Sequence, residues 1–383
     1  MRQPQSYLAT TTLLSFAAVF TILHMRYFSA LNPAACLGSS HESATINKNF
    51  TAEQAAATNL TIFTVPAAHA RRAAEKLALL SWLGLSPRPS VVLIATSTTF
   101  KALTAEAQLY ETVTVAELLL SSGYALDDVP NLAAVFRTAE MVAQTDLLAF
   151  VNADVLLGPD FVLAALGCFA HGPTREVVMV GMREDCGHEG KSNLQDVAGR
   201  PGDDPFTAVK STFNCTPHPP TGKDYFVFSR GFWDRKGGLP PFGIGWKQGA
   251  AYDNFLMEVA LHHGVVVDAS AVVGALHINH PKLHLDARGR RRKVTSDQML
   301  NLRLSREALE RQGLNRSLAL RGLITDAPLL LCPGPCEGRS RKMRIVVRSS
   351  SEICDARQDK CENVNINRRR GRLGATLPWI QYR

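Results

Sequence analysis

The chain has 383 residues, 46% of them hydrophobic and 20% charged, and a formal net charge of +8 at pH 7. These fractions are typical of a folded globular protein and exclude a largely disordered chain. Much of the positive excess lies in two short runs, at residues 288–293 and 368–372, so the rest of the chain is closer to neutral. Basic runs can meet nucleic acid or anionic membrane, but we interpret these as solvated surface and expect no nucleic-acid partner.

The N-terminal segment predicts the compartment. Residues 7–25 are mostly apolar and contain no Asp, Glu, Lys or Arg. A membrane-spanning helix needs ~20 such residues, which is longer than the apolar core of most signal peptides. We therefore predict a tail at residues 1–6 and an uncleaved signal anchor at 7–25. The alternative is a cleaved signal peptide and a secreted protein.

Residues 26–58 are rich in Ser, Asn, Ala and Thr and are predicted to form a stem or linker. Glycosylation sequons follow the apolar segment and are compatible with a body in the lumen of the secretory pathway. They begin at Asn49, Asn59, Asn214 and Asn315.

The eight cysteines suit the same oxidising compartment. Cys186 and Cys215 could form one pair, although pairing cannot be deduced from spacing. A second group lies near the C-terminus, where we favour disulfides over a zinc site because no His is nearby. Its members are Cys332, Cys336, Cys354 and Cys361.

Apolar strands and amphipathic helices alternate from residue 60 onward. Strands are expected at 60–65, 91–95, 112–115, 147–151 and 176–180, and helices at 67–83, 101–110, 131–143 and 161–169. Such alternation predicts an α/β protein with a mostly parallel sheet flanked by helices. Further strands at 225–228 and 265–268 flank a helix at 252–261. The stretch from Arg183 to His218 is interpreted as a lid or acceptor loop.

The stretch from Asp146 to Asp160 carries the strongest chemical signal. Asp154 interrupts an apolar run, where a carboxylate is costly to bury unless it is paired or holds a metal. It also follows a strand, and open α/β sheets bind ligands where strands end. We predict that Asp154 holds a divalent cation against a phosphate. The alternative is that Asp154 only caps a turn.

Several short motifs follow one another in a recognisable order: V-N-A-D-V, P-P-T-G-K-D-Y-F-V-F, P-P-F-G-I-G, D-N-F-L and H-I-N-H. In order and spacing the chain resembles nucleotide-sugar-dependent glycosyltransferases of the GT-A fold, in a group related in architecture to family 2 transferases. The resemblance implies a GT-A domain at residues 59–285, followed by a basic, cysteine-containing C-terminal region at 286–383. The order of tail, anchor, stem and lumenal domain is that of Golgi glycosyltransferases, so it implies a single-pass type II Golgi membrane protein.

The resemblance implies roles for individual residues. Asn152 and Asp154 match the Asp-x-Asp motif of the family, so Asp154 would bind Mn²⁺ or Mg²⁺ on the diphosphate of the sugar nucleotide. His277 or His280 matches a further metal ligand, and carboxylate with imidazole suits Mn²⁺. Asp253 matches the carboxylate that deprotonates the acceptor hydroxyl. The alternative for Asp253 is that it only caps the helix, and the alternative for the histidines is that one of them is structural.

Four further residues are predicted to bind the nucleotide sugar or the acceptor. Asp224 would hold a sugar, unless it is only a turn residue, and Trp246 would offer an apolar face to a sugar ring. Val65 and Pro66, where the first strand ends, would contact the nucleotide sugar. The chain departs from the look-alike group at residues 96–98 and 245–254, which leaves the base, the donor sugar and the acceptor open.

The implied reaction moves a sugar from a nucleotide-diphosphate sugar to a hydroxyl of a glycan, glycoprotein or glycolipid. A cation would stabilise the leaving diphosphate, and a carboxylate would activate the hydroxyl. We expect inversion, with retention left open. The alternatives are a catalytically inactive GT-A-like protein, a lumenal carbohydrate-binding protein, and a nucleotidyltransferase, for which the first strand lacks a glycine-rich phosphate loop.

Overall fold

The structure is a computed structural model, and it describes residues 60–66, 72–108, 110–118, 130–172, 176–187, 204–243, 252–279, 296–315, 322–337, 340–348 and 380–381. The predicted tail, anchor and stem lie outside these ranges, as do Trp246, His280 and both basic runs. Within the described ranges, every helix is too short or too polar to cross a bilayer.

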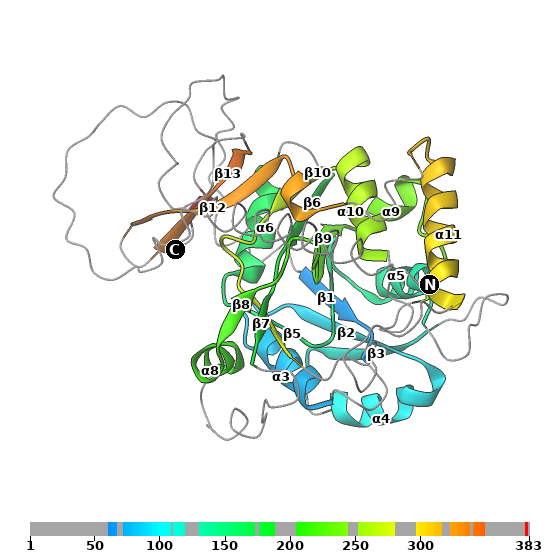
Figure 1. The fold of residues 1–383 in the computed structure, drawn as a ribbon. Helices are drawn as coiled ribbons and strands as arrows, with labels where there is room; N and C mark the ends of the chain where they lie inside the picture. The colour runs from blue at the N-terminus through cyan, green and yellow to red at the C-terminus, as the bar shows by residue number, and fades with distance from the viewer. Residues whose placement is uncertain are drawn as a thin grey trace, which may run out of the picture.

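A mixed ten-stranded sheet forms the centre of the fold (Figure 1), with the order β14-β13-β12-β10-β6-β9-β4-β1-β2-β3. Its strands are β1 (Leu60–Thr64), β2 (Ser90–Ala95), β3 (Val113–Glu117), β4 (Leu147–Val151), β6 (Val177–Gly181), β9 (Tyr225–Ser229), β10 (Val265–Asp268), β12 (Leu329–Glu337), β13 (Ser340–Val347) and β14 (Ile380–Gln381).

The predicted alternation of strands and helices is confirmed, but the sheet is less parallel than expected. β9 lies antiparallel between β4 and β6. Its sequence is a continuous apolar run, and such a run indicates burial on both faces without indicating strand direction. Direction depends on the connection before the strand, which the sequence pattern did not predict.

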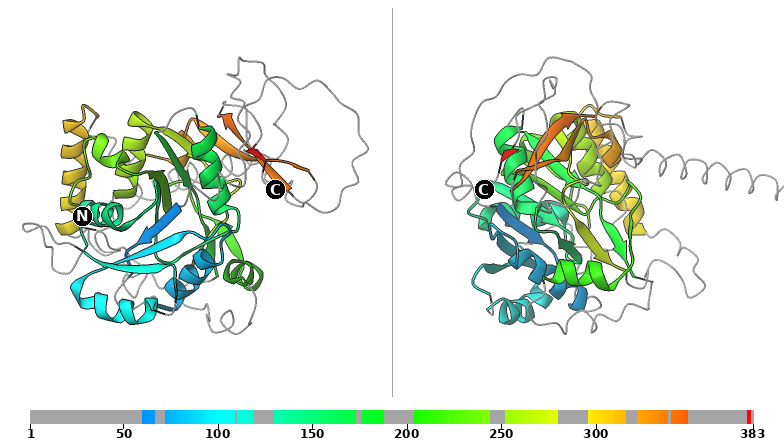
Figure 2. Two further views of the ribbon diagram at one scale, coloured as in Figure 1. Left: turned by 180° about the vertical axis from the view of Figure 1, so that it is seen from behind. Right: turned by 90° about the vertical axis from the view of Figure 1, so that its left-hand side faces the viewer.

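Helices cover both faces of the sheet (Figure 2) and form two apolar cores. Trp82 of α3 and Phe161 of α6 belong to one core, while Phe136 of α5 and Phe255 of α10 belong to the other. The helices are α3 (Arg72–Leu83), α4 (Ser97–Ala107), α5 (Leu132–Val142), α6 (Phe161–His171), α8 (Pro205–Thr212), α9 (Phe232–Arg235), α10 (Tyr252–His263), α11 (Ser296–Arg311) and the 3-10 helix η2 (Ile324–Asp326).

A second sheet of four short strands lies beside the first, in the order β5-β11-β7-β8. It contains β5 (Val155–Leu157), β7 (Glu184–Cys186), β8 (Cys215–Pro217) and β11 (Ala275–Ile278). The stretch from Arg183 to His218, expected to be a lid or acceptor loop, therefore contributes β7, α8 and β8 to the fold. Its two strands are only three residues long and lack alternation of polar and apolar residues, so no local pattern predicts them.

Cys186 and Cys215, a possible pair whose bonding the sequence left open, form a disulfide. The disulfide joins β7 to β8 at directly opposed positions. Cys332 is also disulfide-bonded, and Cys168 is a buried free thiol.

Replacing Cys186 and Cys215 together by alanine should lower the free energy of unfolding by about 3 kcal/mol, because the disulfide closes a loop between residues 29 apart in the sequence. Chemical denaturation at neutral pH measures the loss. The buried thiol variant Cys168→Ser is the matched control for thiol chemistry, because it leaves the disulfide intact. Equal stability of the double variant and the wild type would contradict the prediction that the disulfide between β7 and β8 stabilises the fold.

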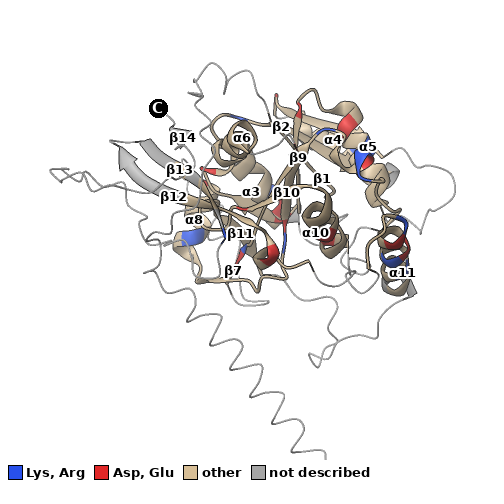
Figure 3. Cartoon of the chain, turned by 90° about the horizontal axis from the view of Figure 1, so that it is seen from above, with Lys and Arg blue, Asp and Glu red and all other residues tan. Residues whose placement is uncertain are grey.

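The described part of the C-terminal region continues the main sheet. β12 pairs in parallel with β10, and β13 and β14 follow it at the sheet edge. α11 packs beside α10, and acidic and basic positions are interspersed along it (Figure 3). The region after residue 285 was expected to be a small cysteine-containing appendage, but these elements belong to the same sheet as the strands before it.

Candidate active site

The candidate site lies where the strand order reverses. Along the chain, β2 and β3 are added on one side of β1 within the sheet, and β4 then pairs with the other side of β1. In open α/β sheets, ligands bind in the crevice beyond the carboxyl ends of such strands. Val65 and Pro66 follow β1 at this edge, and Asn152 and Asp154 follow β4.

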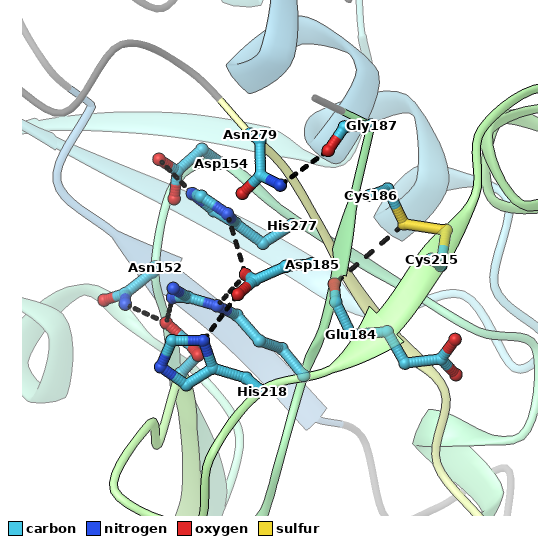
Figure 4. Close-up of polar contacts among 12 residues, drawn as sticks. Asn152, Asp154, Glu184, Asp185, Cys186, Gly187, Cys215, His218, His277 and Asn279 are labelled. Carbon is cyan, nitrogen blue, oxygen red and sulfur yellow. Dashed lines mark hydrogen bonds and ion pairs between the residues drawn. A yellow bond between two sulfur atoms is a disulfide. The ribbon is translucent and has the colours of Figure 1, made fainter. Parts of the chain in front are cut away.

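Asp154 occupies the turn between β4 and β5. The backbone N–H of Val155 donates to the carbonyl of Asn152 at 3.1 Å and closes the turn. The indole N–H of Trp82 donates to the carbonyl of Val155 at 2.9 Å and fixes β5 on α3. The side chain of Asp154 is nearly buried and faces His277 (Figure 4).

His277 lies on β11, opposite Val155 of β5. Its Nε2 is 3.5 Å from Oδ2 of Asp154, and its Nδ1 is 3.4 Å from Oδ1 of Asp185. Burial lowers the pKa of His277, but the two carboxylates raise it, and the net direction is upward. The structure thus brings together two of the three predicted metal ligands.

Asp185 on β7 connects this pair to a second imidazole. Its Oδ2 lies 2.6 Å from Nδ1 of His218, which directly follows β8. Burial raises the pKa of Asp185, but His218, His277 and Arg183 lower it, and the net direction is strongly downward. Cys186 is next to Asp185 on β7, and its disulfide to Cys215 joins β7 to β8, the strand that His218 follows (Figure 4).

Arg183 is a site residue that the sequence pattern placed in a loop. Its Nη1 donates to Oδ1 of Asp224 at 2.7 Å, and its Nε donates to Oδ1 of Asp185 at 2.8 Å. β4 and β6 are both antiparallel to β9, so their carboxyl ends meet at one edge of the sheet. The strand-end rule that selects Asp154 therefore selects Arg183 as well.

Asp224 explains why an amide, and not a carboxylate, fits at position 152. Oδ1 of Asp224 accepts from Nδ2 of Asn152 at 2.6 Å, while the buried Oδ2 has no hydrogen-bond partner among the described residues. The backbone N–H of Asn152 also donates to the carbonyl of Asp224 at 2.9 Å. A carboxylate at position 152 would be repelled by the carboxylate of Asp224, whereas an amide can donate a hydrogen bond to it.

Substitution of Asn152 by aspartate should therefore destabilise the protein in a pH-dependent way. Two neighbouring carboxylates raise the pKa of one of them above its value in the unfolded chain. Such a group stabilises the fold when protonated and loses that contribution as the pH rises, so the variant should lose about 1–3 kcal/mol relative to wild type between about pH 4 and 7.

Urea unfolding at both ends of this pH range measures the effect. Asn131→Asp is the matched control, because the side chain of Asn131 caps α5 by accepting from the N–H of Ala134 and aspartate caps equally well. A loss of stability that is the same at both pH values would contradict the proposed contact with Asp224.

Asp253 lies in the first turn of α10, next to Tyr252. The Tyr252 hydroxyl donates to Oδ1 of Asn152 at 3.3 Å, which joins the start of α10 to the turn after β4. Oδ1 of Asp253 accepts from the N–H of Asn254 at 2.9 Å, and the side chain keeps 25% of its surface exposed. Burial raises the pKa of Asp253 and Lys223 opposes the shift, with a net upward direction.

Asp154 and His277 offer the types of ligand atom that a divalent cation binds. A carboxylate oxygen and an imidazole nitrogen are ligands that Mn²⁺ accepts. Within the described ranges no group of three or more His, Cys, Asp and Glu side chains is arranged to hold a metal. The third predicted ligand, His280, lies outside those ranges, as does the predicted sugar-stacking residue Trp246.

Neither a family model nor a curated protein matches the sequence. Among solved structures, the chain is similar to S. aureus TarS 1–349 in complex with UDP-GlcNAc, at 12% identity and a TM-score of 0.40, over 68% of this chain and 69% of that one. It is also similar to the mannosyltransferase PcManGT from Pyrobaculum calidifontis in complex with GDP-Man and Mn²⁺, at 14% identity and a TM-score of 0.42, over 82% and 79%.

A third similar structure is GalNAc-T7 with UDP, GalNAc and Mn²⁺, at 11% identity and a TM-score of 0.41, over 76% of this chain and 65% of that one. All three TM-scores are below 0.5.

Proposed function

We propose that the protein is a glycosyltransferase that moves a sugar from a nucleoside-diphosphate sugar to a hydroxyl group. One observation carries the proposal: segments far apart in the sequence bring Asp154, His277 and Arg183 to the edge of the sheet where β4 ends, and Tyr252 joins this group to the helix turn that holds Asp253. A cluster that combines an imidazole, a guanidinium and carboxylates suits a phosphorylated donor and proton transfer.

In this proposal Asp154 and His277 hold a divalent cation, Mn²⁺ or Mg²⁺. When bound, such a cation neutralises charge on the diphosphate of the donor. Arg183 adds a fixed positive charge beside it, held by Asp224 and Asp185. Asp224 is itself only 3% exposed, so it contributes by orienting Asn152 and Arg183 towards the sugar nucleotide.

Asp253 takes the proton of the acceptor hydroxyl as the hydroxyl oxygen attacks the anomeric carbon of the sugar. The bond from that carbon to the diphosphate breaks, and the nucleoside diphosphate leaves with the electron pair. Partial burial and the nearby carboxylate of Asp224 raise the pKa of Asp253, which makes it a stronger base than an exposed aspartate. Attack opposite to the leaving group gives inversion.

We further propose that the protein acts in the Golgi lumen as a single-pass type II membrane protein, anchored by residues 7–25. The acceptor is then a glycan, glycoprotein or glycolipid of the secretory pathway. The disulfides at Cys186 and Cys332 are compatible with that compartment.

Calorimetry with a panel of nucleoside diphosphates, with and without Mn²⁺, tests donor binding. The expected result is metal-dependent binding of one nucleotide. If the folded protein binds none of them, the proposal fails and a carbohydrate-binding protein without nucleotide sugar becomes the better account.

A further inference from the structure

Lys223 precedes Asp224 and buries its ammonium group beneath the start of α10. Its side chain is fully buried, with 0% of its surface exposed. Nζ donates to Oδ1 of Asn254 at 2.6 Å and to the carbonyl of Gly322 at 2.8 Å. It also lies 3.9 Å from Oδ2 of Asp253. A buried ammonium is costly unless oxygens surround it, so these contacts fix its position.

The peptide of Gly322 is held from two sides. Its carbonyl accepts from Lys223, and its N–H donates to Oε1 of Glu258, one turn further along α10 from Asn254, at 2.6 Å. The backbone of Gly322 has φ +56°, and a Cβ there would come within 2.8 Å of the carbonyl of Asn254. Only glycine allows this close approach without strain, so a segment of the C-terminal region is docked on the turn that carries Asp253.

The charges around Asp253 make Lys223 its main electrostatic partner. Burial raises the pKa of Asp253 and Lys223 lowers it, whereas Asp224 raises it further. Burial lowers the pKa of Lys223 in turn, against the attraction of the carboxylates around it. Among the described residues, the other titratable groups that act on this pair are Asp224, Tyr252, Glu258 and Asp326.

We propose that Lys223 is a positioning residue whose buried ammonium fixes the Asp253 carboxylate at the start of α10 and ties it to the peptide of Gly322. The inference rests on the proposed function, in which Asp253 accepts the proton of the hydroxyl. Lys223 itself touches no substrate. The Gly322 segment, which lies in the C-terminal region, becomes part of the support of the site.

A double-mutant cycle on the full chain tests the coupling without any activity assay. Lys223→Met places an apolar side chain beside Asp253, so the loss of stability that this substitution causes should depend on whether residue 253 is charged. Lys223→Met should change the unfolding equilibrium constant of the wild type by roughly fivefold or more beyond its effect on the Asp253→Asn variant. Chemical denaturation of wild type, both single variants and the double variant gives this value.

The pH profile of sugar transfer tests the functional consequence. Without Lys223 the pKa of Asp253 rises, so the base stays protonated to a higher pH and the acid limb of kcat should move upward by roughly one pH unit. Lys236→Met is the matched control, because Lys236 pairs with Glu176 at 2.6 Å and has no part in the site. Its acid limb should stay at the wild-type position.

The outcomes separate the two proposals. Coupling in the stability cycle without turnover of any nucleotide sugar would support the position of Lys223 and contradict the transferase. Additive effects with an unshifted acid limb would overturn the role of Lys223. If Lys223→Met does not fold, Asn254→Ala replaces it, because it removes one of the two oxygens that accept from the Lys223 ammonium. A shifted acid limb of kcat supports the role of Lys223, and an unshifted acid limb overturns it.

Discussion

Replacing Asp154 by alanine is expected to reduce turnover of the donor by about a hundredfold or more, because it removes the carboxylate proposed to hold the cation on the diphosphate. The variant should also lose metal-dependent binding of the nucleotide. Steady-state kinetics with the donor identified by calorimetry measures the first effect, and calorimetry itself measures the second. Asp154→Asn, which keeps the shape of the side chain, should show the same losses with less effect on folding.

Asp146→Ala is the matched control for Asp154. Asp146 directly precedes β4 and its side chain is exposed, so it is the same residue type at the opposite end of the same strand. It should leave donor binding and turnover at wild-type values. Metal-dependent nucleotide binding that survives in a folded Asp154→Ala variant would contradict the assigned role of Asp154.

Replacing Asp253 by asparagine is expected to lower kcat by roughly 10²–10⁴-fold while leaving donor binding unchanged. The amide keeps the shape of the side chain but cannot accept the proton of the acceptor hydroxyl. Pre-steady-state or steady-state transfer measurements, combined with calorimetric binding of the donor, separate the two quantities. The loss should fall on kcat, and slow hydrolysis of the donor should persist.

The helix-cap interpretation of Asp253 predicts a different result, and Asp204 supplies the comparison. Asp204 caps α8 by accepting from the N–H of Thr207 at 3.0 Å and lies on the exposed surface. Asp204→Asn should change stability by less than about 1 kcal/mol and leave transfer unaffected. If Asp253→Asn behaves in the same way, Asp253 is a structural residue and another group is the base.

The sequence predicted the parts of the site that follow recognisable strands. Asp154 stands after a continuous apolar run, and such a run indicates both the strand and its carboxyl end, where ligands bind. Asp253 was predicted from the D-N-F-L motif at a helix start. His277 lies on a four-residue strand that pairs with β5, and its apolar neighbours gave the only local signal for that strand.

Asp185 and His218 were missed because their positions depend on tertiary pairing, whereas Arg183 follows the end of β6, a signal in the sequence that could have selected it. β7 and β8 are too short to show a period, and they form by pairing, β7 with β11 and β8 with β7. Lys223 was hidden for another reason: a lysine beside a turn is ordinarily exposed, and only contact with Gly322, 99 residues away, reveals its burial. Local patterns do not encode contacts of that range.

The most direct test of the central claim is turnover of a panel of nucleotide sugars by the full-length protein with Mn²⁺ and a mixture of hydroxyl acceptors, followed as release of nucleoside diphosphate and recovery of the sugar on an acceptor. The account predicts that one nucleotide sugar is consumed, that its sugar appears on an acceptor hydroxyl, and that both signals are lost in Asp154→Ala and Asp253→Asn. Consumption of none of them by folded protein with the Cys186–Cys215 disulfide formed would contradict the account.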